Sequence, residues 1–117
     1  MKIRNGFVSN SSSSSFIING YKVELKDNVD DGVYDFYDEV YELSKYKNEI
    51  VYEYDNGILY IGRGYSTGCG KEFDKVYDIN KITMTEEQEL TIHDFFKKYT
   101  KYIKNYKKGI YAGMVSC

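Results

Sequence analysis

Residues 16–25 read Phe-Ile-Ile-Asn-Gly-Tyr-Lys-Val-Glu-Leu, and this stretch indicates the class of fold. Aromatic and β-branched side chains, which favour strands, stand on both sides of Asn19-Gly20. An Asn-Gly pair strongly favours a two-residue type I′ turn, because both turn positions need a positive φ. We therefore expect a β-hairpin in which residues 16–18 and 21–25 are the two strands.

A second hairpin is indicated further along the chain. Its predicted strands are residues 49–54 and 58–63, and they are joined by a slightly longer loop at Asp55-Asn56-Gly57. A shorter β-like stretch follows at residues 75–79, and residues 110–116 could close the sheet.

Two segments have the three- and four-residue spacing of amphipathic helices. Thr85, with Gln88 three positions later, predicts a capping box at the start of the second segment, and Gly109 after Lys107-Lys108 predicts its end. The apolar positions are Val29, Val33, Phe36, Val40 and Leu43 in the first segment, and Ile92, Phe96, Tyr99, Ile103 and Tyr106 in the second.

These elements predict one α+β domain over residues 1–117: an antiparallel sheet built from hairpins, with two amphipathic helices packed on one face. A hydrophobic fraction of 42% excludes a disordered chain. No run approaches the roughly 20 apolar residues that span a bilayer, and Lys2 and Arg4 are followed by serines rather than by an apolar signal-peptide core. We therefore expect a protein that stays in the cytosol in which it is made, with no membrane contact.

The composition is rich in tyrosine, with 14 tyrosines and no proline or tryptophan. A tyrosine side chain combines a large apolar area with a polar hydroxyl, which suits contact surfaces. The codon bias of a low-GC genome would also enrich tyrosine, and the sequence leaves both explanations open.

Charge is unevenly distributed along a chain whose net charge is −2. Residues 27–42 contain seven acids and no base, whereas residues 97–108 contain six lysines and no acid. These runs fit two solvated helix faces, and they also fit a pair of interaction patches. Direct DNA binding is disfavoured, because the chain lacks a broad basic footprint. The acids that we expect to contact a basic partner protein are Asp31, Asp35, Asp38 and Glu42.

Two polar segments predict an anion-binding site. Five consecutive serines, residues 11–15, offer hydroxyl and amide donors, and Arg4 adds a guanidinium group suited to phosphate. Residues 62–71 are rich in glycine but form no P-loop, because Tyr65 and Glu72 replace its first glycine and its final Ser/Thr. A flexible serine run and an ordinary glycine loop are the alternatives. The expected ligand-binding residues are Arg4, Ser11, Ser12, Ser13, Ser14, Phe16, Tyr60, Arg63, Tyr65, Ser66, Thr67 and Lys71.

Residues 1–16 read Met-Lys-Ile-Arg-Asn-Gly-Phe-Val-Ser-Asn-Ser-Ser-Ser-Ser-Ser-Phe, and they resemble the opening block of short, uncharacterised phage and prophage proteins of low-GC bacteria. Tyr60-Ile61-Gly62-Arg63 is similar to a strand end in some of them. The resemblance implies a small accessory phage protein, for which counter-defence is a common occupation. It implies no catalytic residues.

Enzymatic chemistry is poorly supported by the sequence. His93 stands alone beside Asp94, and the spacing gives no support to a dyad with Cys69. Cys69 and Cys117 cannot complete a four-ligand zinc site, and the acids around Asp30 lack the pattern of a calcium loop, so we expect no metal and no cofactor.

Two functions are therefore expected from different classes. The first is a non-enzymatic sponge that sequesters a phosphorylated nucleotide signal. The second is a protein–protein inhibitor of the anti-CRISPR type that uses its acidic helix. Open strand edges and the apolar stripe of the second helix also predict a homodimer.

Overall fold

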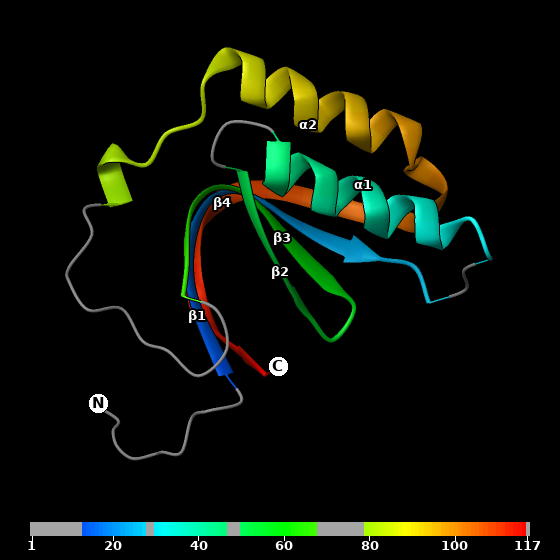
Figure 1. The fold of residues 1–117 in the computed structure, drawn as a ribbon, viewed down its shortest axis with the longest axis horizontal. Coiled ribbons are helices and arrows are strands. Elements are labelled where there is room, and N and C mark those ends of the chain that lie inside the picture. The colour runs from blue at the N-terminus through cyan, green and yellow to red at the C-terminus, as the bar shows by residue number, and fades with distance from the viewer. Residues whose placement is uncertain (1–12, 28–29, 47–49, 68–78, 117) are drawn as a thin grey trace.

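The computed structural model describes residues 13–27, 30–46, 50–67 and 79–116. The four strands form one antiparallel sheet in the order β2-β3-β1-β4, which confirms the predicted α+β class. Figure 1 shows α1 and α2 side by side on one side of this sheet. In chain order the elements are β1 (Ser13–Leu25), α1 (Val33–Tyr46), β2 (Ile50–Asp55), β3 (Ile58–Ser66), η3 (Ile79–Lys81), α2 (Glu86–Lys98), η4 (Thr100–Tyr102) and β4 (Ile103–Ser116).

The sheet is bent into an arch, and the helices lie on its convex side (Figure 1). Gly20 of β1 pairs with Gly62 of β3 on one side and with Gly109 of β4 on the other. A Cβ atom on Gly20 would lie 2.2 Å from the carbonyl oxygen of Ile61 and 2.6 Å from the Cα of Gly62. The strands can approach this closely only because these positions carry no side chain.

The hairpin predicted at Asn19-Gly20 is wrong. Strand β1 runs without interruption through both residues and pairs with β3 and β4 along its length. Among the described residues, the positive φ values belong to Asn56 and Gly57, not to Asn19 or Gly20. The glycine serves the close packing of three strands, a tertiary requirement that local turn propensity does not reveal.

The second predicted hairpin is confirmed as β2 and β3. Asp55 pairs with Ile58, so the turn contains only Asn56 and Gly57, with φ values of 49° and 80°. The loop is therefore shorter than expected, and it has the positive φ values of a type I′ turn.

The second helix is shorter than predicted. Its capping box is confirmed, because the Gln88 amide donates to the Thr85 hydroxyl and the Gln88 side chain accepts from the Thr85 amide. The helix ends at Lys98, and Ile103 and Tyr106 belong to strand β4. Gly109 lies inside that strand rather than at a helix end. Residues 103–116 are held as a strand by their long ladder with β1, although their apolar spacing also fits a helix.

The main core lies between the two helices and the convex face of the sheet. Phe36 of α1 and Phe95 of α2 are almost fully buried, and their ring centroids are 5.1 Å apart. The apolar stripe of α2 covers the sheet, so it is not free for the dimer contact that we expected of it. The buried residues of this core are Tyr21, Val23, Val33, Phe36, Val40, Leu43, Ile50, Leu59, Ile61, Ile92, Phe95, Phe96, Tyr99, Tyr102 and Ile103.

A smaller cluster fills the concave side of the arch, where Phe16, Ile18 and Val115 are buried. Phe16 pairs with Ser66 near one end of β3, whereas Tyr60 pairs with Lys22 towards its other end. The rings of Phe16 and Tyr60 are nevertheless 4.9 Å apart, because the arch brings the two ends of the strands together.

Several expected features lie outside the described residues. They are Val29, the β-like residues 75–78, Cys69 and Cys117; Ile79, the last residue of that β-like stretch, begins η3. Within the described part of the chain, neither helix is long and apolar enough to cross a bilayer.

Candidate functional site

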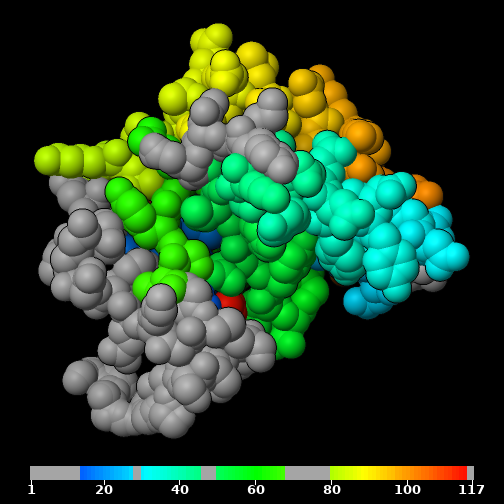
Figure 2. Space-filling view, in the orientation of Figure 1, coloured from blue at the N-terminus to red at the C-terminus, as the bar shows by residue number. Residues whose placement is uncertain are grey.

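The outward surface of α1 exposes three tyrosines, although tyrosine side chains are usually partly buried. Tyr34, Tyr37 and Tyr41 are 67%, 42% and 51% exposed. At 100° per residue these three rings form one stripe along the helix, and Asp35, Asp38 and Glu42 form an adjacent stripe. Figure 2 shows α1, in cyan, on the surface that faces the viewer. We call these six residues the α1 outer face.

The acids of this face, together with Asp31 just before α1, are exposed to solvent. The four acids that the sequence predicted as partner contacts form no ion pair within the described ranges: Asp31, Asp35, Asp38 and Glu42. Two neighbouring acids are paired with lysines: Glu39 with Lys98 at 2.8 Å, and Asp30 with Lys101 at 2.9 Å.

Asp30 holds the start of α1 in place. Its side chain accepts from the Gly32 amide at 3.0 Å, and its backbone carbonyl accepts from the Val33 amide at 3.1 Å. Hydrogen bonds from the Tyr102 hydroxyl and then from Lys101 lower the pKa of Asp30 to about 2. The helix is thereby tied to the segment that precedes β4.

A shallow groove of about 470 Å³ runs between α1 and the end of α2. Asp35, Asp38 and Glu42 line its α1 side, and Lys98 and Tyr99 line the other. The Tyr99 hydroxyl donates to Glu39 of α1 at 3.1 Å, so this hydrogen bond links the two sides of the groove. The groove presents carboxylates without an excess of cations, which is unsuited to phosphate and suited to a cationic side chain.

The end of the serine run, Ser14 and Ser15, meets the end of β3, as an anion site would require. The Ser15 amide donates to the Thr67 hydroxyl at 3.0 Å, and the Thr67 amide donates to the Ser15 carbonyl at 3.0 Å. The buried Ser14 hydroxyl, however, donates to the Glu53 carboxylate at 2.9 Å, and the Ser66 hydroxyl donates to the same oxygen. A carboxylate therefore occupies the place expected for a ligand anion.

The expected ligand-binding residues do not gather at one place. Because strand side chains alternate between faces, Ser14, Phe16, Tyr60 and Ser66 belong to the concave face, and Arg63 and Tyr65 to the opposite one. The Arg63 guanidinium donates to the carbonyl of Thr83 at 3.1 Å. Ser13 opens strand β1, whereas Arg4, Ser11, Ser12 and Lys71 lie outside the described residues.

Two lysines on the concave face were not among the predicted site residues. Lys22 pairs with Lys107 across the β1–β4 ladder and with Tyr60 across the β1–β3 ladder. Like charges directly opposite each other are unfavourable, and an anion would relieve their repulsion. The sequence did not reveal this pair. The turn predicted at Asn19-Gly20 placed Lys22 in a short hairpin, and the helix predicted to run as far as Gly109 placed Lys107 on a different element.

His93 is not the isolated surface residue that the sequence predicted. Its Nε2 lies 2.9 Å from the Tyr21 hydroxyl, which is also 3.1 Å from Glu89, while Lys108 pairs with Glu89 at 2.7 Å. Burial and then the Glu89 hydrogen bond raise the pKa of Tyr21 to about 12. Burial opposes ionisation of Glu89, but hydrogen bonds from Lys108 and Tyr21 outweigh it and lower the pKa. The neutral Tyr21 side chain of β1 bonds to Glu89 and His93 of α2, and it therefore links α2 to the sheet.

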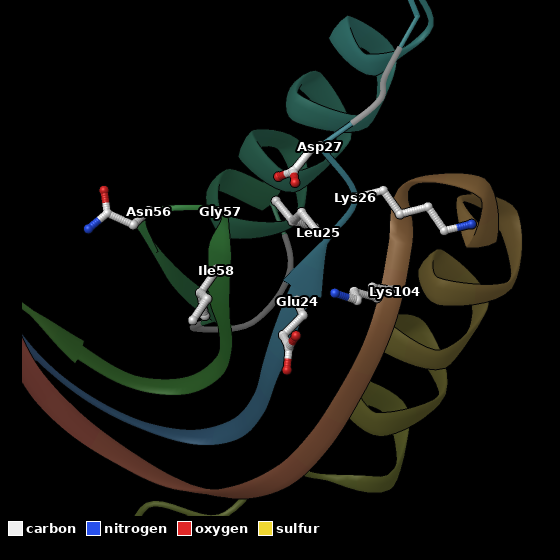
Figure 3. A pocket seen from close by; sticks show the side chains of 8 residues that line it. All are labelled: Glu24, Leu25, Lys26, Asp27, Asn56, Gly57, Ile58 and Lys104. Carbon is white, nitrogen blue, oxygen red and sulfur yellow. The ribbon is translucent and has the colours of Figure 1, made fainter.

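A pocket of about 580 Å³ lies at the end of the arch beside the β2–β3 turn (Figure 3). Lys104 reaches it from a bulge, because Glu24 pairs with Asn105 while Leu25 pairs with Ile103. Glu24 and Asp27 supply opposite charge, and in Figure 3 Lys26 points away from the other lining side chains. This mixture of exposed charges selects no ligand class. Within the described ranges, no three His, Cys, Asp or Glu residues are grouped to hold a metal ion.

Comparison of the chain with protein-family models, with curated proteins and with solved structures gives no match.

Proposed function

We propose that this protein is a non-enzymatic binding protein that docks its α1 outer face on a basic surface of another protein. The observation that carries the proposal is the exposure of Tyr34, Tyr37 and Tyr41 beside acids that have no ion pair among the described residues. Tyrosines are enriched at protein interfaces because they bury a large area at a small entropic cost.

The two stripes have complementary physical roles. The carboxylates of Asp35, Asp38 and Glu42 attract a positively charged surface and speed the encounter. The tyrosine rings then supply apolar contact and faces on which arginine or lysine side chains can stack. An arginine-bearing partner surface satisfies both stripes at once.

The N-terminal resemblance to phage proteins gives this binding a biological setting. We propose that the partner is a host defence protein and that docking inhibits it, in the manner of an anti-CRISPR protein. Many such targets bind nucleic acid through basic surfaces, which an acidic helix would occupy.

The test compares two double charge reversals in a bacterial host lysate. Asp38→Lys/Glu42→Lys alters the α1 outer face, whereas Asp27→Lys/Asp94→Lys makes the same change in net charge at exposed positions elsewhere. Tagged wild-type and control proteins should retain the same host protein, and the α1 variant should lose it at least tenfold, as quantified by mass spectrometry. Equal retention by all three proteins would refute the role of α1.

A nucleotide sponge is the second candidate, favoured by the row of Tyr60, Lys22 and Lys107 on the concave face. Tyr60 could stack on a base while the lysines hold phosphate. A panel of mono-, di- and cyclic nucleotides should then raise the melting temperature of the wild type but not that of Lys22→Ala/Lys107→Ala. No shift with any member of the panel would discard this candidate.

A further inference from the structure

Strand β4 leaves one edge of the sheet open. On one side this strand of 14 residues pairs with β1, with a bulge at Lys104, and no strand of the described ranges pairs with the other side. A long open edge offers a row of unsatisfied amides and carbonyls to another strand.

The open edge is divided by charge into two halves. Lys104, Lys107 and Lys108 lie in the first half, whereas residues 109–116 carry no charge. In the uncharged half Ile110 is 47% exposed and Met114 is 51% exposed. Ala112, between them on the same face, is exposed as well. Lysines protect an edge from pairing, so the second half is the part left open to it.

We propose that residues 108–116 pair in antiparallel register with the same segment of a second copy of this chain, around a twofold axis at Ala112. In this register Ile110 lies opposite Met114 of the second copy, and Ala112 lies opposite its own equivalent. Lys108 lies opposite Ser116, so no lysine faces a lysine. An axis at Lys108 would set that lysine against its own equivalent, whereas an axis at Ala112 lies near the middle of the uncharged half and pairs this half almost entirely with itself.

This contact is self-complementary, as a twofold dimer requires, and it joins the two sheets into one. Exposed apolar side chains gain cross-strand partners on one face, and the edge amides and carbonyls gain hydrogen bonds. The inference does not rest on the proposed function, because the α1 outer face lies on a helix and not on this edge.

The test uses the position on the axis, where one substitution changes both sides of the contact. Multi-angle light scattering at about 10 and 200 μM should give a dimer for the wild type. Ala112→Lys and Ala112→Glu each set like charges opposite each other and should raise the dimer dissociation constant about fivefold or more. An equimolar mixture of the two variants should restore the dimer, because Lys then faces Glu.

Two controls keep the result interpretable. Asn105→Lys adds a charge to β4 outside the proposed contact and should remain dimeric. If the charged variants at Ala112 lower the melting temperature, Ile110→Lys, at another exposed position in the contact, decides by the same measurement. A monomeric wild type at 200 μM overturns the proposal, and so does a dimer that persists in both Ala112 variants.

Discussion

At the scale of single residues, the hydroxyls of two tyrosines differ in their hydrogen bonding. The hydroxyl of Tyr21 bonds to Glu89 and His93, whereas the buried hydroxyl of Tyr54 has no hydrogen-bond partner among the described residues. Burial raises the pKa of Tyr54 above its usual value. The ring of Tyr54 packs edge-on against Tyr37 at 5.6 Å, so its contribution to stability is apolar.

Replacing Tyr54 by phenylalanine removes a buried polar group that the fold leaves unpaired. We expect Tyr54→Phe to leave the free energy of unfolding unchanged or to raise it by up to about 1 kcal/mol. Tyr21→Phe is the matched control and should lower it by about 1–2 kcal/mol, because Glu89 and His93 lose a bonded neighbour. Urea unfolding of the three proteins measures both effects, and equal losses in the two variants would contradict the assignment.

At the scale of elements, the features that depend on residues nearby in sequence were predictable, and the features that depend on residues distant in sequence were not. The Asn56-Gly57 turn, the buried stripe of α1 and the capping box at Thr85 depend on neighbours in sequence, and all three are confirmed. The path of β1 through Gly20 depends on Gly62 and Gly109, which are distant in sequence. Tertiary packing overrode the turn propensity there.

The arch makes Gly20 intolerant of even a methyl group. In Gly20→Ala the added Cβ meets the Ile61 carbonyl oxygen and the Gly62 Cα, both of them backbone atoms, so the strands must separate. We expect a loss of at least about 2 kcal/mol in unfolding free energy. Gly113→Ala, whose Cβ would sit 3.6 Å from the Phe16 ring, should change stability by less than about 1 kcal/mol. Thermal and urea unfolding compare the two variants. If Gly20→Ala lost no more stability than Gly113→Ala, the sheet would be flatter than described.

The tie between α1 and the start of β4 should be sensitive to acid. The pKa of Asp30 is lowered from its unfolded value of 3.8 to about 2, so its contribution to stability is present above pH 3.8 and is lost as the pH falls through 2. Asp30→Asn should therefore melt below the wild type at pH 6, and the two melting temperatures should converge between pH 4 and 2. A constant gap over this range would show that the charge of Asp30 is not what holds the helix.

At the scale of the whole molecule, the ion pairs of the described residues contribute little to stability. The described ion pairs are exposed on at least one side, and such pairs contribute little to the fold. Four acids near and on α1 remain without an ion pair in the described part of the chain. These acids were identifiable from sequence because helical spacing places them on one surface. The Lys22–Lys107 pair was not, because cross-strand register cannot be deduced from composition.

Salt should therefore separate folding from binding. Raising NaCl from about 0.1 to 1 M shortens the Debye length from about 10 to 3 Å. We expect the melting temperature to move by only a few degrees, while the host protein retained through the α1 outer face is released. Circular dichroism and the retention assay read the two effects, and retention that survives 1 M salt would point to an apolar contact instead.

The strand order has a consequence for how the chain assembles. Strand β1 precedes the other described strands in the chain and lies inside the sheet between β3 and β4, so Phe16 finds its β4 partner Gly113 only after α1, β2, β3 and α2 have been made. The β2–β3 hairpin can form locally, whereas β1 must wait for its last neighbour. The sheet is therefore completed only when β4 has been made, and the concave cluster around Phe16 stays open to solvent until Val115 joins it.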